Sequence, residues 1–310
     1  MANTRNIAVL TARREQQLKL ELASRVAHLI GRAETQTTAI PGVTLHQRTA
    51  PTAACHVTYE PSVIVVAQGR KEVQIGKDTL TYDSSRYLLT SVALPTVTRV
   101  SEASEDAPCL AVSLKLDIAM VREFLSRDEF HVPGVPPHRP AISLCPVTAK
   151  FLSAWCRLLD LLSNPEDIPF LSGLLEREIM YRILRGPEGE RLRAIATLGD
   201  QSHRTAKAIN WIKTNYGRPL RVEELAEIAG MAVSTLHHNF RALTAMSPLQ
   251  YQKHIRLQAA RARMLADDVD AATVAFEVGY ESASQFNRES AACLANRRSG
   301  MSGICVRRAL

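Results

Sequence analysis

The residues of this sequence with the clearest capacity for chemistry are polar side chains on one predicted helix in the last third of the chain. Leu236 and Phe240 are four residues apart, so both would project from one helical face and anchor it in a core. The outer face keeps hydroxyl, imidazole and guanidinium groups: Ser234, Thr235, His237, His238 and Arg241. Such groups hydrogen-bond phosphate oxygens and base edges, so this face predicts polar recognition of a ligand that carries them.

The elements that would position this face follow a repeated pattern. Ala226 precedes Gly230 with three residues between them, and Ala275 precedes Gly279 in the same way, 49 residues later. In a helix-turn-helix, a small residue lies where the two helices meet and glycine is favoured where the chain turns. The sequence therefore predicts two such units, at about 220–245 and 271–290, joined by a linker helix over Pro248–Leu265. Two recognition helices about one duplex turn apart can enter successive major grooves on one face of DNA.

The charge distribution agrees with this prediction but is only a modest bias. The chain has 310 residues with a formal net charge of +7, 46% hydrophobic and 22% charged residues, which is enough for a sizeable core and two domains. Residues 200–310 hold 15 Lys and Arg against 10 Asp and Glu, whereas residues 1–199 hold 23 against 21. The basic excess is therefore concentrated in the C-terminal third, which would attract a polyanion.

Upstream, short segments rich in Val, Ile, Thr and Tyr alternate with turn residues and predict a β-barrel or sandwich. The predicted strands are 43–47, 56–59, 62–67, 72–75, 79–82, 86–90, 96–100 and 110–116. Helical periodicity predicts one helix before them, over 13–30, and three after them, over 118–125, 147–162 and 170–184. We predict an α+β fold: a domain at 1–198 with a barrel at about 40–116 and helices at about 117–197, then an all-α domain at 199–310, with the boundary near Leu198.

Many positions in the last third keep the order and spacing of a known family: Leu225-Ala226, Gly230-Met231, Leu236, Phe240, Ser247-Pro248, Tyr251, Arg256-Leu257, Gly279-Tyr280-Glu281-Ser282 and Phe286. Through them, residues 205–289 resemble the AraC/XylS transcription regulators. Residues 40–185 resemble the N-terminal sensor domain of one AraC-type subgroup, through Tyr59-Glu60-Pro61-Ser62, Gln68-Gly69-Arg70-Lys71, Tyr87-Leu88-Leu89 and 174–179. The likeness implies a cupin-like β-barrel that senses a small molecule or a partner.

The resemblance also implies which residues face double-stranded DNA. The family's first recognition helix falls on Ser234 to Arg241, and the second falls on Ala283 to Arg288, directly after Ser282. The second helix would offer Ser284, Gln285, Asn287 and Arg288 to the groove, and Ser282 just before it is also a candidate DNA contact. Asn and Gln suit adenine, whereas Arg suits guanine or a phosphate.

Further partners follow from the same reasoning. We expect a small-molecule effector in the N-terminal domain, but its pocket residues stay unassigned because the strand register is unknown. As an activator, a member of this family would contact RNA polymerase. We also expect a homodimer through the helices at 118–184, because this region has more apolar helix than a small barrel needs to cover it.

After Glu289 the sequence departs from the family, whose members usually continue with an aromatic residue, basic residues and Leu-Phe-Gly. Here Ser290 takes the place of the inward aromatic, and a shifted reading frame of the same stretch can encode the expected ending. We hypothesise a frameshift at about residue 289, which resequencing the 3′ end of the gene would test. A poorly folded second unit and weaker DNA binding would follow, so an alternative is a ligand-binding or dimerising module that has lost DNA binding.

Enzymatic and metal chemistry have little support in the sequence. The His-x-His cluster of metal-binding barrels is absent, and the histidines at positions 46, 56, 131 and 138 are dispersed. We expect no cofactor and no catalytic residues, which leaves a cupin-type enzyme as the weaker alternative. Cys55 and Cys109 fall in the barrel region and leave a thiol sensor open, although buried unreactive cysteines are commoner.

The expected compartment is the cytoplasm. The first 30 residues contain charges and no continuous apolar core, and no uncharged run approaches transmembrane length. The six cysteines are scattered without a close pair, which fits a reducing setting. We therefore expect no membrane partner.

Overall fold

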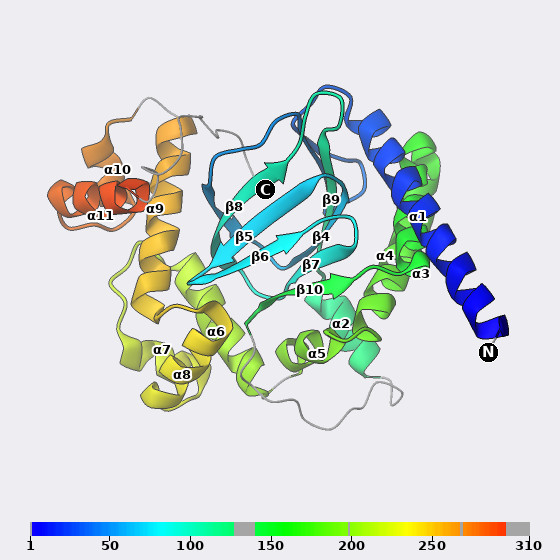
Figure 1. The fold of residues 1–310 in the computed structure, drawn as a ribbon. Helices are drawn as coiled ribbons and strands as arrows, with labels where there is room; N and C mark the ends of the chain where they lie inside the picture. Colours follow the sequence, from blue (N-terminus) through cyan, green and yellow to red (C-terminus); the bar gives the residue numbers. More distant parts are fainter. Residues whose placement is uncertain (1, 127–139, 198, 267–268, 296–310) are drawn as a thin grey trace.

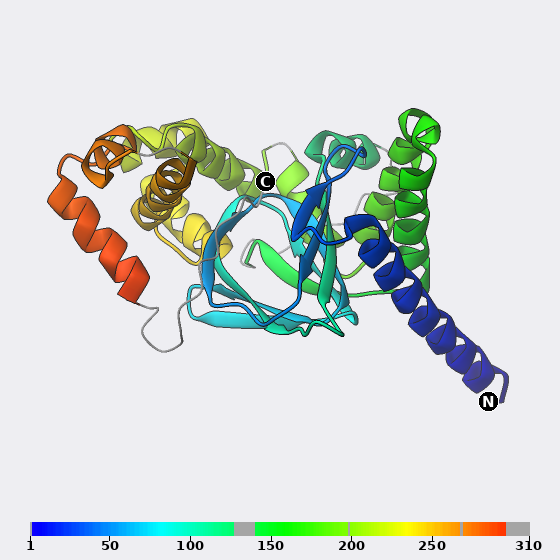
Figure 2. The same cartoon turned by 90° about the horizontal axis from the view of Figure 1, so that it is seen from above.

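The computed structural model describes residues 2–126, 140–197, 199–266 and 269–295. A β-barrel built from two antiparallel sheets lies between a layer of N-terminal-domain helices and a C-terminal helical domain (Figures 1 and 2). The six-stranded sheet has the order β1-β2-β9-β4-β7-β10, and the four-stranded sheet has the order β3-β8-β5-β6. The strands are β1 (Thr35–Thr37), β2 (Val43–Arg48), β3 (Cys55–Tyr59), β4 (Ser62–Gln68), β5 (Arg70–Ile75), β6 (Asp78–Tyr82), β7 (Arg86–Thr90), β8 (Leu94–Glu102), β9 (Cys109–Lys115) and β10 (Ile142–Pro146).

The six-stranded sheet is buried on both faces, and its side chains alternate between two cores. In β4, Val63 and Val65 point to a core shared with the helices, whereas Ile64 and Val66 point into the barrel. This alternation follows from the period of two along a strand. A strand covered on both faces reads as a continuous apolar run, which explains the stretch from Val63 to Ala67.

The helices of the N-terminal domain cover the outer face of the six-stranded sheet (Figure 2). They are α1 (Ala2–Ile30), α2 (Ile118–Leu125), α3 (Ala149–Asp160), α4 (Ile168–Leu184) and α5 (Gly189–Ala196), with short 3₁₀ segments at Leu161–Ser163 and Pro165–Asp167. Helix α1 packs along α3 with Leu18, Leu22 and Val26 in the shared core. Arg25 of α1 donates to Asp160 at 2.6 Å, which joins the ends of the two helices.

The C-terminal domain consists of α6 (Gln201–Thr214), α7 (Val222–Ala229), α8 (Val233–Thr244), α9 (Pro248–Ala266), α10 (Ala271–Glu277) and α11 (Ala283–Ala295). Its first helices share a core with the barrel interior, because Ile209, Phe240 and Tyr251 belong to the same buried cluster as Leu88 and Leu94. Two buried hydrogen bonds cross this boundary. The Tyr251 hydroxyl donates to the Ala93 carbonyl at 2.9 Å, and the Ala141 amide donates to the Leu243 carbonyl at 2.9 Å.

The predicted α+β fold with a barrel followed by a helical domain is confirmed, but several boundaries differ. The first helix begins at Ala2 instead of residue 13. A strand, β10, lies inside the range predicted as helical, because its pairing with β7 is a long-range contact that local sequence does not show. Helix α5 lies within the range predicted as helical but outside the three helices predicted there. Leu198, the predicted boundary residue, lies outside the described residues.

Candidate DNA-reading helices and barrel cavity

The first helix-turn-helix unit is formed by α7 and α8. Gly230 ends α7 in the left-handed conformation with φ +65°, which a glycine adopts without strain. Leu236 and Phe240 are fully buried, and the Phe240 ring meets Tyr251 of α9 edge-to-face at 5.5 Å between centroids. Asn239, also buried, donates to Gln201 of α6 at 3.0 Å. These contacts fix the inner side of α8 and leave its opposite side free to face a ligand.

The five residues predicted on the outer side of α8 lie where the sequence analysis placed them. Ser234, His237, His238 and Arg241 are exposed, and Thr235 is half-buried. The two adjacent histidines project at different angles from the helix, so they cannot chelate one ion. Together the five side chains form a polar surface, which we call the α8 face.

The second unit is formed by α10 and α11 and has its own small core. Asp270 caps α10 by accepting from the amides of Ala272 and Thr273. Phe286 is buried against Tyr280, with ring centroids 5.3 Å apart. Gly279 has φ +93°, and a Cβ there would lie 2.1 Å from the carbonyl oxygen of Gly217, so no other residue fits this turn without a shift of backbone.

The predicted side chains of α11 divide into two groups. Ser284, Gln285, Asn287 and Arg288 are exposed and form what we call the α11 face. Ser282 is half-buried, and its hydroxyl accepts from the amides of Ser284 and Gln285, so it caps the start of α11. This cap is recognisable from the sequence, because serine just before a helix is a start signal.

Arg256 and Glu289 attach the second unit to the rest of the domain, and the sequence analysis gave neither residue a role. Arg256 of α9 donates to the carbonyls of Tyr216 and Arg218 and lies over the Tyr280 ring. Glu289 accepts from the Tyr280 hydroxyl at 2.9 Å and pairs with Lys253 at 3.6 Å. The sequence departs from the family pattern after Glu289, but helix α11 continues past this residue to Ala295.

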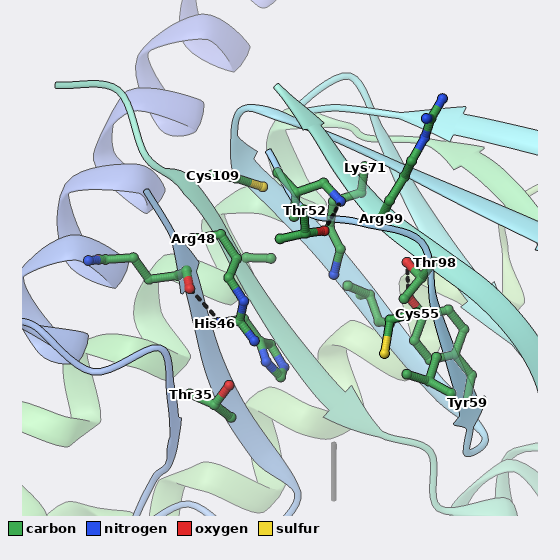
Figure 3. A pocket seen from close by; sticks show the side chains of 15 residues that line it. Thr35, His46, Arg48, Thr52, Cys55, Tyr59, Lys71, Thr98, Arg99 and Cys109 are labelled. Carbon is green, nitrogen blue, oxygen red and sulfur yellow. Dashed lines mark hydrogen bonds between the residues drawn. The ribbon is translucent and has the colours of Figure 1, made fainter. Parts of the chain in front are cut away.

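Inside the barrel lies a cavity of about 140 Å³ between the two sheets. Its walls come from strands far apart in sequence, and its described lining residues include Thr35, His46, Gln47, Arg48, Thr52, Cys55, Val57, Tyr59, Ile64, Lys71, Thr98, Arg99, Val100, Cys109 and Ala111. Figure 3 shows Arg48, Lys71 and Cys55 around this space, with Arg99 directed away from it. Arg99 instead pairs with Glu72 at 2.6 Å.

The cavity is positively charged. Lys71 faces inward because it alternates with Val73 and Ile75, which are buried in the barrel. Arg48 reaches Glu34 at 3.9 Å, whereas Lys71 has no ion pair in the described part of the chain, and none of the described lining residues is acidic. Burial, with Lys71 and Arg48 nearby, lowers the pKa of His46 to about 3, so this imidazole is neutral at physiological pH. Its Nε2 lies 3.0 Å from the Ser113 hydroxyl.

The two cysteines considered for a thiol sensor both line this cavity. Burial raises the pKa of the Cys109 thiol, which keeps it protonated and makes it a weak nucleophile. No group of three or more His, Cys, Asp or Glu suited to a metal ion occurs among the described residues. His131 and His138 lie outside them. The described residues also contain no helix long and apolar enough to span a membrane.

Comparison with known proteins matches each of the two domains to a described protein family. Residues 39–191 match the family described as "AraC-type transcriptional regulator N-terminus", and residues 225–295 match the family described as "Helix-turn-helix domain". The chain belongs to the AraC/XylS family. The resemblance seen in the sequence is therefore confirmed: the barrel and its helices form the AraC-type N-terminal domain, and the paired units form the helix-turn-helix domain.

Curated relatives are similar to part of the chain. The transcriptional activator RhaS of Yersinia pestis is 27% identical over 88 residues, which is 28% of this chain and 32% of the relative, and RhaS of Pectobacterium carotovorum is 25% identical over 91 residues. The match thus spans about a third of the length of these relatives. ToxT of Vibrio cholerae in its unsaturated-fatty-acid-bound form shares the fold, with a TM-score of 0.52 at 12% identity over 81% of this chain and 90% of ToxT.

Proposed function

We propose that this protein is a sequence-specific DNA-binding transcriptional regulator controlled by a small molecule held in its barrel. The observation that carries the proposal is the pair of helix-turn-helix units, each with a buried aromatic anchor and an exposed polar face, on one connecting helix. An exposed helix with such a face, fixed from behind, is the arrangement that reads a major groove.

The side chains of the two faces supply the chemistry of DNA recognition. On the α8 face, Arg241 suits a phosphate or a guanine edge, while the hydroxyls and imidazoles suit either phosphates or bases. On the α11 face, Gln285 and Asn287 suit adenine and Arg288 suits guanine. The protein then makes polar contacts in two adjacent grooves, and contact with RNA polymerase follows from its position on a promoter.

The test of DNA binding is a footprint of the purified full-length protein on the DNA that flanks its own gene, repeated across a salt series. Protection of two adjacent major grooves, with affinity that falls as salt rises, supports the proposal. Arg241→Ala should weaken binding and reduce the salt slope by about one if Arg241 contacts a phosphate. The matched control is Arg99→Ala, which removes an exposed arginine from the barrel surface.

The other footprint outcomes decide between the alternatives. Protection of a single groove means that the second unit does not bind, as the departure after Glu289 predicts. No protection at any salt overturns the proposal and favours a ligand-binding or dimerising module. The cupin-type enzyme has no supporting observation in the described cavity, whose lining contains neither a metal-ligand cluster nor an acidic side chain.

The cavity suits a small anion as effector, because the Lys71 ammonium group faces into it. An ammonium group that faces a cavity without an acidic partner carries an uncompensated desolvation cost, which a bound carboxylate would offset. The cavity volume of about 140 Å³ is close to that of a protein cavity of about 150 Å³ that holds benzene. A carboxylate with one ring or a short chain matches both features. ToxT, which shares the fold, is described with an unsaturated fatty acid bound, also a carboxylate.

A homodimer through the helices of the N-terminal domain completes the proposal. On α4, Phe170 is 78% exposed and Leu174 is 62% exposed, and Leu171 lies beside them. Residues four apart share a helical face, so these side chains form an apolar ridge on the first two turns of α4. A second copy of the chain would cover this ridge and place two DNA-binding domains on one operator. The cytoplasm is the compartment in which such a regulator meets DNA.

A further inference from the structure

Strand β3 has two faces with two different environments. Cys55, Val57 and Tyr59 line the barrel cavity, and Cys55, at the start of the strand, also accepts from Arg261 of α9 at 3.9 Å. The intervening His56 and Thr58, together with Glu60 just after the strand, reach the C-terminal helical domain. The period of two along a strand produces this division, so one strand separates the cavity from α9 and α6 of the helical domain.

The outer face of β3 makes three separate contacts with the helical domain. The Thr58 hydroxyl hydrogen-bonds the Gln258 side chain of α9. The rings of His56 and His254 stack, with centroids 6.4 Å apart and an interplanar angle of 24°. Glu60 accepts from Lys213 of α6 at 2.5 Å. Helix α9 is therefore held at two consecutive turns by a wall of the cavity.

A different part of the barrel holds the start of α9. The buried hydrogen bond from Tyr251 to the Ala93 carbonyl and the packing of Tyr251 on Phe240 fix this end, and neither Ala93 nor Tyr251 lines the cavity. At a rise of about 1.5 Å per residue, Gln258 lies about 10 Å along the helix from Tyr251, and Ala266 lies about 22 Å from Tyr251. A displacement at Gln258 is thus roughly doubled at the end of α9, which leads directly into the second helix-turn-helix unit.

β3 is also suited to move. It lies at the edge of the four-stranded sheet and pairs with β8 alone in the described sheets, so one ladder of backbone hydrogen bonds resists its displacement. We propose that β3 transmits the state of the cavity to α9: an occupant displaces the inner side chains of β3, the outer contacts to His254 and Gln258 shift, and the second recognition helix changes its position relative to the first. This inference rests on the proposed effector site and specifies how that site is coupled to DNA binding.

The test fills the cavity without a ligand. Ala111 lies on β9 in the opposite wall of the cavity. Ala111→Leu therefore fills part of the cavity without replacing any residue of β3. The measurement is amide hydrogen exchange of the full-length protein, followed by mass spectrometry. Exchange in α9 around residues 254–258 should rise about twofold or more, which corresponds to the smallest coupling energies measured between residues in contact. The matched control is Ala67→Leu, which is in the same sheet but points to the helix-side core.

The variant Thr58→Val completes a double-mutant cycle, because it removes the outer hydrogen bond and keeps a β-branched side chain on the strand. If β3 carries the coupling, Ala111→Leu has a smaller effect on α9 exchange once Thr58 is replaced, because one of the contacts between β3 and α9 is already lost. Effects that simply add, or an α9 that does not respond to Ala111→Leu, overturn the inference. If the Leu variant does not fold, Ala111→Val makes the same test with a smaller side chain.

A second arm separates this inference from the proposed ligand class. Sodium benzoate serves as the probe, with binding measured by calorimetry. If benzoate binds and raises α9 exchange in wild type, and raises it less in Thr58→Val, both proposals are supported. If benzoate does not bind while Ala111→Leu still changes α9, the ligand class is wrong and the transmission through β3 stands. If benzoate binds and α9 does not respond, the transmission is wrong.

Discussion

Lys71 and Lys77 lie on the same hairpin of the barrel but in different surroundings. Lys71 is half-buried and faces the cavity, whereas Lys77 is exposed in the turn between β5 and β6. The difference comes from the strand period, since Lys71 alternates with buried Val73 and Ile75. A bound anion in the cavity would lie close to the charge of Lys71 and far from that of Lys77, so only Lys71 would interact strongly with it.

The first prediction therefore compares these two lysines. Lys71→Met should weaken the binding of benzoate about tenfold or more, because a charge-assisted hydrogen bond is lost. Lys77→Met should leave the affinity unchanged. In wild type, bound benzoate should also raise the pKa of His46 from about 3, because a nearby anion favours the imidazolium. Calorimetry measures the affinity and NMR of the His46 ring measures the pKa; equal affinities in both variants would contradict the prediction.

The second prediction concerns stability in acid. Unfolded His46 takes up a proton near pH 6.5, whereas folded His46 does so only at about pH 3. Between these values the unfolded state binds more protons, so His46 should reduce the free energy of unfolding by at most about 1.4 kcal/mol for each unit that the pH falls. Urea unfolding of His46→Gln should show a shallower decline than wild type over this range.

The control for this stability measurement is His28→Gln, which replaces an exposed histidine on α1. It should follow the wild-type decline. If His46→Gln follows it too, the imidazole does not resist protonation in the folded state.

At the scale of elements, each helix-turn-helix unit depends on a glycine at its turn, but the two glycines do so for different reasons. Gly230 needs only its left-handed conformation, since a Cβ there would meet nothing within 4 Å. Gly279 needs that conformation and also the absence of a side chain, because the Gly217 carbonyl occupies the space. The first requirement could be read from the sequence, whereas the second depends on a contact between residues 62 positions apart.

The third prediction uses this difference. Gly230→Ala should cost about 1–2 kcal/mol of stability from the left-handed conformation alone. Gly279→Ala should displace the second unit, so protection of the second groove disappears while protection of the first remains. Footprints of both variants on the same DNA make the comparison. A normal two-groove footprint with Gly279→Ala would contradict the predicted clash.

At the scale of the whole molecule, exposed apolar surface and the DNA-reading faces lie on different helices: the apolar ridge is on α4, and the DNA-reading faces are on α8 and α11. The α4 ridge of Phe170, Leu171 and Leu174 belongs to the N-terminal-domain helices, far along the chain from α8 and α11. A pair of chains joined through α4 would therefore keep all four recognition helices uncovered by the dimer contact. Burial of the ridge would supply the driving force for association.

The fourth prediction tests this association. Phe170→Glu combined with Leu174→Glu should convert a dimer to a monomer, measured as molar mass by light scattering during gel filtration. Leu20→Glu is the control, because Leu20 is an exposed leucine on α1, outside the ridge. A wild-type protein that is monomeric at every concentration would contradict the dimer proposal.

The sequence by itself determined the helical domain and its two candidate faces. The anchors Leu236 and Phe240, the glycines that end α7 and α10, and the polar residues between anchors are local patterns, because a helix relates residues three and four apart. The exposed positions of Ser234, His237, His238 and Arg241 could be predicted for this reason. Ser282 lies at the start of α11, and its hydroxyl caps this helix by accepting from the amides of Ser284 and Gln285.

Only the tertiary structure decided the cavity and its coupling to the helices. His46 comes from the six-stranded sheet, whereas Cys55 and Lys71 come from two strands of the four-stranded sheet. A shift of one residue in strand pairing would turn each of these side chains to the opposite face. The same holds for β10, which joins the sheet at β7, and for β3, whose outer face meets α9 some 200 positions later in the chain. Strand pairing and domain packing are long-range contacts, and they set which side chains share a site.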